Sequence, residues 1–152
     1  LPLRPAPESR PPPRAADAGC MRILVIEDDF VSRTVLTRFL EPFGEVTAAP
    51  DGHAGLSTYR QAAQAGTPFD LVTLDMMMPG IDGLQVLKEM RTYEGEQTDK
   101  ELAAKVLMTT ALDDVKNVTA AYDAMCDDYL AKPIRKAVLF EKLQKLGFAL
   151  PS

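Results

Sequence analysis

Short apolar runs alternate with longer amphipathic segments along the chain, from residue 21 to about residue 147. A continuous apolar run bounded by polar residues is typical of a strand that is covered on both faces. Apolar positions spaced three and four residues apart are typical of a helix. The apolar runs predict five strands, at 22–26, 45–49, 69–74, 105–110 and 128–131.

The amphipathic segments predict a helix after each strand. The first covers about 30–41, and its apolar stripe comprises Val31, Val35, Leu36, Phe39 and Leu40. Asp51 can cap the second helix, which the Gly-Thr-Pro break at 66–68 ends. The third helix contains Leu84 and Met90 and precedes a charged connection over 93–100.

The last two helices complete an alternating order. The fourth covers about 113–124, and the fifth has Pro133 in its first turn, where the missing N–H is tolerated, and ends near Gly147. Five strand–helix units imply an α/β fold with a parallel sheet and helices on both faces. Ligands of such folds bind beyond the carboxyl ends of the strands.

Composition narrows the function classes. The 152 residues are 46% hydrophobic and 26% charged, as in a globular protein. The net charge of −5 argues against nucleic-acid binding, and no apolar run approaches the roughly 20 residues that span a bilayer. Cys20 and Cys126 are too few for a disulfide scaffold or a four-cysteine zinc site, and His53 is the only histidine. Carboxylates are therefore the expected functional groups.

The first 20 residues differ from the remainder. Six of the twelve prolines lie within the first thirteen residues, and such a segment cannot bury a core. We interpret residues 1–20 as a disordered leader or tag remnant, with Met21 as the natural start, and residues 21–149 as one domain. The leader lacks the apolar stretch of a secretory signal, so we expect a cytoplasmic location.

Four of the predicted strands end in side chains that can carry out chemistry. These are Glu27, Asp28, Asp75, Thr110 and Lys132. The carboxyl ends of neighbouring parallel strands share one edge of the sheet, so the carboxylates are expected to converge there. Clustered negative charges need a compensating cation, and all-oxygen ligands suit Mg²⁺. Each residue alone has an ordinary structural explanation, but their joint placement predicts a site.

Four motifs built on these residues resemble those of response-regulator receiver domains of two-component signalling. They are Ile-Leu-Val-Ile-Glu-Asp-Asp at 23–29, Asp-Met-Met-Met-Pro-Gly-Ile-Asp-Gly at 75–83, Thr-Ala at 110–111 and Asp-Asp-Tyr-Leu-Ala-Lys-Pro at 127–133. The resemblance covers about residues 21–147. It implies a flavodoxin-like, doubly wound (βα)5 fold with a parallel five-stranded sheet in the strand order 2-1-3-4-5.

The resemblance implies that Asp75 is the phosphoacceptor. Its donor is a phosphohistidine on a sensor histidine kinase or a phosphotransfer protein. The implied ligands of Mg²⁺ (or Mn²⁺) are Glu27, Asp28, Asp75 and the backbone carbonyl of Met77. The chemistry agrees with the residue types, because phosphoryl transfer needs in-line positioning and positive charge at the equatorial oxygens.

The resemblance also implies a switch. Thr110 turns toward the phosphoryl group, Lys132 pairs with it, and Tyr129 is the aromatic residue that responds. The fourth helix, fifth strand and last helix then form a face that binds a downstream protein. We expect a stand-alone receiver that is not an enzyme beyond its own phosphotransfer and autodephosphorylation, with neither nucleic acid nor membrane as a partner.

One pair of residues departs from the family pattern. Receivers commonly have Gly-Ala before the fifth strand, where this chain has Met125 and Cys126. Glycine ends a helix in the left-handed conformation at little cost, so Met125 either accepts strain of about 1 kcal/mol or more or ends the helix differently. We interpret Cys126 as a small buried hydrophobic residue and His53 as a cap or surface residue of the second helix.

Several alternatives stay open at this point. The chain could be a phosphorelay intermediate or an unphosphorylated pseudo-receiver scaffold. An aspartyl-phosphate hydrolase also uses a strand-end aspartate with Mg²⁺, but usually has a second acid two residues later, where this chain has Met77. A flavin-binding module would need a hydroxyl-rich phosphate loop after the first strand, where residues 27–29 are acidic.

Overall fold

A parallel sheet forms the centre of the molecule in the computed structural model, which describes residues 21–97, 103–111 and 125–151. Its strands are β1 (Met21–Ile26), β2 (Gly44–Ala49), β3 (Leu71–Asp75), β4 (Lys105–Thr110) and β5 (Asp128–Ala131). They are arranged in the order β2-β1-β3-β4-β5, and all neighbours run parallel. The fold class and strand order predicted from the sequence are confirmed.

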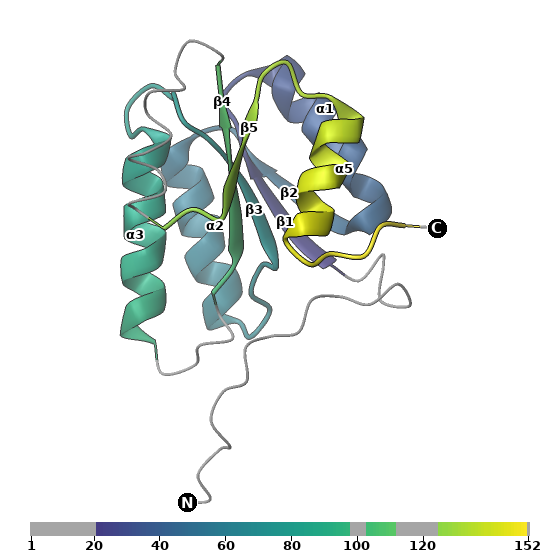
Figure 1. Cartoon of the computed structure of the whole chain (residues 1–152). Coiled ribbons are helices and arrows are strands. Elements are labelled where there is room, and N and C mark those ends of the chain that lie inside the picture. The colour runs from purple at the N-terminus through teal and green to yellow at the C-terminus, as the bar shows by residue number, and fades with distance from the viewer. Residues whose placement is uncertain (1–20, 98–102, 112–124, 152) are drawn as a thin grey trace, which may run out of the picture.

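Helices cover both faces of this sheet (Figure 1). They are α1 (Phe30–Leu40), the short 3₁₀ helix η2 (Glu41–Phe43), α2 (Gly52–Gln64), α3 (Gly83–Glu96) and α5 (Lys136–Lys145). One core cluster, which includes Leu74 and Met90, lies under α2 and α3, and a second, which includes Leu36 and Leu143, lies under α1 and α5. The predicted helix over 113–124 and the predicted leader lie outside the described residues.

Aspartates begin three of the helices through the same contact. The side chains of Asp29, Asp51 and Asp82 each accept a hydrogen bond from the backbone N–H three residues later, at 2.8, 2.8 and 2.9 Å. Each bond satisfies an amide that the first turn of a helix leaves without a backbone partner. The caps therefore set the points at which the loops after β1, β2 and β3 turn into α1, α2 and α3.

Two predicted helix patterns are corrected by the structure. Val31 was expected in the apolar stripe of α1 but is 66% exposed, because this helix buries only the later positions Leu36 and Leu40. The connection predicted from residue 93 is helical as far as Glu96, because Tyr93 packs against the core and Glu94 is buried. Because this stretch is polar, the sequence pattern predicted the end of the helix too early.

The start of the last helix is also corrected. Pro133 does not lie in the first turn, because α5 begins three residues later, at Lys136. The chain still follows the sheet at Lys132, whose N–H donates to the carbonyl of Thr110 at 2.7 Å, and Lys132 and Pro133 are joined by a cis peptide bond. Among the described residues, no helix has both the length and the apolar character required to cross a membrane.

The sequence left two possibilities for Met125, which replaces the usual glycine before β5: a strained backbone or a different helix end. The structure shows the strained backbone. Met125 has a φ of 74°, in the left-handed region that side chains other than glycine rarely adopt. Cys126 is buried, as predicted, and burial together with Asp127 and Asp128 raises the pKa of its thiol to about 11. His53 lies exposed in the first turn of α2.

A buried polar network that the sequence pattern did not predict lies at the amino ends of β4 and β5. At its centre is Arg91 of α3, whose partners are Glu94 (2.7 Å), Asp127 (3.0 Å) and the carbonyls of Ala104 (2.9 Å) and Met125 (3.0 Å). Glu94 also accepts hydrogen bonds from the Tyr59 hydroxyl and the Ala104 N–H. The network joins α2, α3 and β4 to the strained turn at Met125.

Candidate functional site

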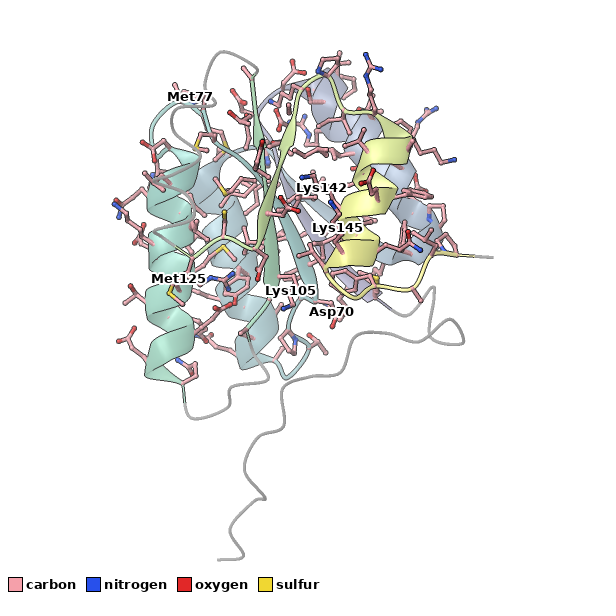
Figure 2. All side chains as sticks on the ribbon, in the orientation of Figure 1. Asp70, Met77, Lys105, Met125, Lys142 and Lys145 are labelled. Carbon is pink, nitrogen blue, oxygen red and sulfur yellow. The ribbon has the colours of Figure 1, made fainter. Side chains whose placement is uncertain are left out.

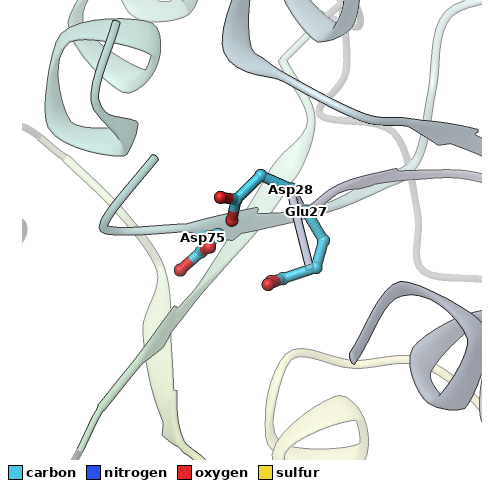
Figure 3. A group of neighbouring side chains, drawn as sticks. All are labelled: Glu27, Asp28 and Asp75. Atoms are coloured by element: carbon cyan, nitrogen blue, oxygen red, sulfur yellow. The ribbon is translucent and has the colours of Figure 1, made fainter. Parts of the chain in front are cut away.

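Three carboxylates meet at the carboxyl edge of the sheet (Figure 3). Glu27 and Asp28 follow β1, Asp75 ends β3, and these two strands are neighbours. One carboxylate oxygen of each residue lies within 4.8 Å of the others. Glu27 and Asp75 are buried, whereas Asp28 is exposed. The acids that the sequence predicted to converge therefore do so, in a cluster that is open to solvent on one side.

Lys132 is the cation of this acidic cluster. Its Nζ lies 2.8 Å from Oε1 of Glu27 and 3.2 Å from Oδ1 of Asp75. Burial by itself lowers the pKa of the Lys132 ammonium, but its hydrogen bond to Glu27 and the charges of Glu27 and Asp75 outweigh burial, so the pKa is raised. Lys132 therefore stays charged and links the end of β5 to the ends of β1 and β3.

Asp75 lies in surroundings that oppose its negative charge. Burial, followed by the charge of Glu27 and the hydrogen bond to Asp28, raises the pKa of Asp75 to about 7, although Lys132 acts in the opposite direction. One ammonium group thus fails to balance three carboxylates. A cation bound among them would restore the balance and favour the ionised form of Asp75.

The oxygen donors of the acidic cluster fit a magnesium ion. Mg²⁺ prefers oxygen ligands and is commonly held by one or two carboxylates together with water and phosphate oxygens. Glu27, Asp28 and Asp75 supply only oxygens, and the exposed Asp28 leaves the site accessible to water. These three residues would hold the ion. The contribution of the Met77 backbone carbonyl stays a prediction.

The loop after β3 follows the Asp75 side chain closely. The N–H of Met77 donates to Oδ1 of Asp75 at 3.3 Å, and the Met77 side chain is 58% exposed. Farther along, Gly83 donates its N–H to the Met76 carbonyl at 3.0 Å, and a Cβ at Gly83 would lie 2.1 Å from the carbonyl oxygen of Asp75. Only glycine permits this approach, so Gly83 positions the loop against Asp75.

Two adjacent threonines at the end of β4 face opposite sides of the sheet. Thr109 pairs with Asp75 in the strand register and donates its hydroxyl to Oε2 of Glu27 at 3.4 Å. Thr110, the predicted phosphoryl contact, is buried and donates to the Ala111 carbonyl at 3.2 Å. Sequence reasoning missed the contact from Thr109, which the alternation of side chains along β4 could have indicated.

Tyr129 lies on the same face of the sheet as Thr110. The register pairs Tyr129 with Met108, and Thr110 is two residues after Met108, so the three side chains point to one side. The ring of Tyr129 packs at the margin of the core cluster under α2 and α3. Thr110 and Tyr129 are therefore diagonal neighbours on adjacent strands.

Comparison with protein families accounts for this arrangement. The sequence profile of the family described as "Response regulator receiver domain" matches residues 23–144. The chain belongs to this family. The matched region contains the whole acidic cluster, Lys132, both threonines and Tyr129, so the resemblance that the four motifs indicated is confirmed for the receiver as a whole.

Curated relatives of this receiver include regulators and kinases. It is 35% identical over 127 residues to the regulatory protein VanRB of Enterococcus faecalis, a match that covers 83% of this chain and 52% of that protein. It is 30% identical over 127 residues to the hybrid signal transduction histidine kinase L of Dictyostelium discoideum, covering 83% of this chain and 7% of that protein. The chain thus spans about half the length of the first relative and a small part of the second.

Solved structures share the fold of this receiver. A response regulator receiver domain protein from Clostridium thermocellum is 25% identical, with a TM-score of 0.69 over 84% of this chain and 94% of that one. The CheX–CheY–BeF3–Mg complex of Borrelia burgdorferi contains a chain that is 22% identical, with a TM-score of 0.71 over 85% of this chain and 90% of that one. At that identity the second match supports the fold alone.

Proposed function

We propose that this receiver accepts a phosphoryl group on Asp75 and uses it to change a protein-binding face. The observation that carries the proposal is the set of charges around one buried carboxylate: Glu27 and Asp28 on one side and the Lys132 ammonium 3.2 Å away. A sensor histidine kinase or a phosphotransfer protein supplies the group from a phosphohistidine, in a reaction that depends on Mg²⁺ or Mn²⁺. The match to a hybrid histidine kinase supports this class of donor.

The transfer exchanges one bond to phosphorus for another. A carboxylate oxygen of Asp75 attacks phosphorus in line with the P–N bond, which breaks, and the imidazole of the donor leaves with the electron pair. Lys132 neutralises charge on the transferred oxygens, and a magnesium ion, which Glu27, Asp28 and Asp75 would hold, would supply further positive charge there. The receiver contributes positioning and electrostatics, as expected of a signalling domain. In its autodephosphorylation water attacks the same phosphorus, the P–O bond to Asp75 breaks, and the carboxylate and inorganic phosphate are released.

Thr110 and Tyr129 transmit the effect of phosphorylation from Asp75 to the protein-binding face. The phosphoryl group adds negative charge at Asp75, and the Thr110 hydroxyl exchanges its bond to the Ala111 carbonyl for a phosphoryl oxygen. Tyr129 then moves into the space that Thr110 leaves on the shared face of the sheet. The surface formed by β5, α5 and the predicted helix over 113–124 thereby changes its affinity for a downstream protein.

Intact-mass measurement after incubation with acetyl phosphate and Mg²⁺ tests the chemistry. Wild type is expected to gain the mass of one phosphoryl group, and Asp75→Asn to gain none. Asp70→Asn is the matched control, because Asp70 precedes the same strand at the opposite end of the sheet from Met77 (Figure 2). Equal labelling of wild type and Asp75→Asn, or no labelling of wild type, would contradict the proposal.

A second candidate function is that of a phosphorelay intermediate. It is favoured by matches to two proteins named as kinases, a hybrid histidine kinase and the sensor protein GacS of Pseudomonas syringae, of which the matched region is 7% and 14%. In that case the phosphoryl group of Asp75 passes to a histidine of another protein. Phosphorylated receiver mixed with a histidine phosphotransfer domain would then lose its added mass as the domain gains it.

A further inference from the structure

A lysine of α5 lies on the ring of Tyr129. The Nζ of Lys142 is 5.0 Å from the ring centroid, and it also lies 3.1 Å from Oδ1 of Asp128. The same oxygen of Asp128 accepts a hydrogen bond from the Tyr129 N–H at 2.8 Å. Lys142, Asp128 and Tyr129 therefore contact one another and connect α5 to the edge strand β5.

The neighbouring lysine on the same helix makes a different set of contacts. The Lys145 side chain is 63% exposed, and it forms an ion pair at 3.6 Å with Glu141, one turn away on α5 itself. The Lys142 side chain is only 22% exposed and its partner Asp128 14%. Figure 2 labels both lysines on α5. Of the two, Lys142 is thus the one tied to the sheet, and its ammonium is more strongly held because fewer waters compete for it.

The contact matters because of where Tyr129 sits. A cation over an aromatic face is attracted by the negative charge of that face, so it favours the ring orientation that keeps the face beneath the ammonium. Tyr129 shares a face of the sheet with Thr110, the residue proposed above to move on phosphorylation. A rotation that carries this face of the ring away from the ammonium loses the contact with Lys142.

We propose that Lys142 is a positioning residue for Tyr129: it holds the ring in the orientation seen here and so favours the unphosphorylated state of the receiver. Asp128 fixes the ammonium from the other side. The proposal rests on the proposed switch through Thr110 and Tyr129. A ligand that favours the other ring orientation must overcome the contact, so losing Lys142 strengthens the binding of that ligand.

Beryllofluoride with Mg²⁺, a mimic of the phosphoryl group, is the probe. Its apparent dissociation constant is measured by titration calorimetry for wild type, Lys142→Met, Lys142→Arg and Lys145→Met. Lys142→Met is expected to bind about two- to fivefold more tightly, as the loss of one partly exposed cation–π contact predicts. Lys142→Arg keeps both the cation and the ion pair and is expected to match wild type, as is Lys145→Met.

A double-mutant cycle distinguishes positioning from a general effect of charge or stability. In a Tyr129→Ala background, Lys142→Met is expected to leave the affinity for beryllofluoride unchanged. NMR of the Tyr129 ring without beryllofluoride provides an independent measurement, in which Lys142→Met shifts the ring resonances and Lys145→Met does not. An equal gain in affinity with and without the Tyr129 ring, or an equal gain in Lys145→Met, overturns the inference. Absence of beryllofluoride binding and of acetyl phosphate labelling in wild type instead overturns the proposed function.

Discussion

Two clusters of charged side chains, each built around a buried carboxylate, lie at opposite ends of the sheet and differ in how their charges are balanced. At the amino ends of β4 and β5, every guanidinium nitrogen of Arg91 and both oxygens of Glu94 have hydrogen-bond partners. At the carboxyl ends of β1 and β3, three carboxylates gather, and among the described residues Lys132 is the cation paired with their side chains, through Glu27 and Asp75. The first cluster is complete, and the second carries an excess of negative charge.

This difference in charge balance indicates which buried charges have a functional role. A buried charge whose hydrogen bonds are all made contributes to one defined structure, and its removal leaves its partners unpaired. A buried carboxylate whose neighbours oppose its ionisation is instead ready for a cation or a new bond, and the raised pKa of Asp75 reports this condition. Residue type alone does not separate the two, since both clusters combine carboxylates with basic side chains.

Removing the cation of the balanced cluster is expected to have the largest effect. Arg91→Met should lower the free energy of unfolding by about 3–5 kcal/mol, because it leaves the buried Glu94 and the half-buried Asp127 without the guanidinium that pairs with both. Urea unfolding measures the change. Arg60→Met is the control: the exposed Arg60 lies 3.9 Å from Glu89, and its loss should change stability by less than about 0.5 kcal/mol. Equal effects of the two substitutions would show that the Arg91 network is not a buried structural unit.

Removing a charge from the unbalanced cluster is expected to act in the opposite direction. Without divalent cations, Asp75→Asn should raise the free energy of unfolding by about 1–3 kcal/mol at about pH 8. The pKa of Asp75 is raised from 3.8 to about 7, so the folded state binds the proton more tightly than the unfolded state. The stability that this proton provides in wild type is present at low pH and is lost as the pH rises through about 7.

The advantage of Asp75→Asn should therefore shrink toward about pH 4 and should also shrink when Mg²⁺ is added, since the ion stabilises wild type. Urea unfolding of both proteins across this pH range, with and without Mg²⁺, measures the two trends. A constant difference at all pH values would mean that the ionisation of Asp75 is not opposed by its surroundings.

Two buried threonines on one face of the sheet allow a finer comparison, between a hydroxyl that donates to the acidic cluster and one that does not. Thr109→Val removes the hydroxyl that donates to Glu27 and should lower the free energy of unfolding by about 1 kcal/mol. Thr73→Val is the matched control, because the Thr73 hydroxyl is buried and has no hydrogen-bond partner in the described part of the chain, and should be neutral or slightly stabilising. Thermal unfolding without Mg²⁺ measures both. The same sign for both would contradict a role for Thr109 in holding Glu27.

The exposed methionine beside the acidic cluster gives the smallest expected effect. Met77→Asn should accelerate loss of the phosphoryl group roughly three- to tenfold, or about 1 kcal/mol in barrier, because a smaller polar side chain admits water to Asp75. The decay of the added mass after removal of acetyl phosphate measures the rate. Met125→Asn is the control, since Met125 is similarly exposed but lies near the other end of the sheet (Figure 2). An unchanged rate in Met77→Asn would refute shielding by Met77.

The strands and the acidic cluster were predictable because both depend on short-range patterns. A run such as 23–26 can be buried only between two layers of helices, and the residue after a parallel strand must lie at the carboxyl edge. Glu27, Asp28 and Asp75 were therefore expected to meet, and they do. The same argument from strand ends predicted Thr110 and Lys132, and the family motifs added Tyr129; the roles of these three residues rest on the proposal made above.

The sequence by itself determined the order of strands and helices along the chain and the sheet edge at which the acids gather, but it left the conformation of Met125 open between strain and a different helix end. Only the tertiary structure decided which charges are balanced. Glu94 belongs to a stretch that looks like a solvated connection, yet it is buried beside Arg91. The reason is that charge balance depends on contacts between distant residues, such as Arg91 with Asp127, 36 positions apart, and Lys132 with Glu27, 105 positions apart. No local pattern of polar and apolar residues specifies such pairs.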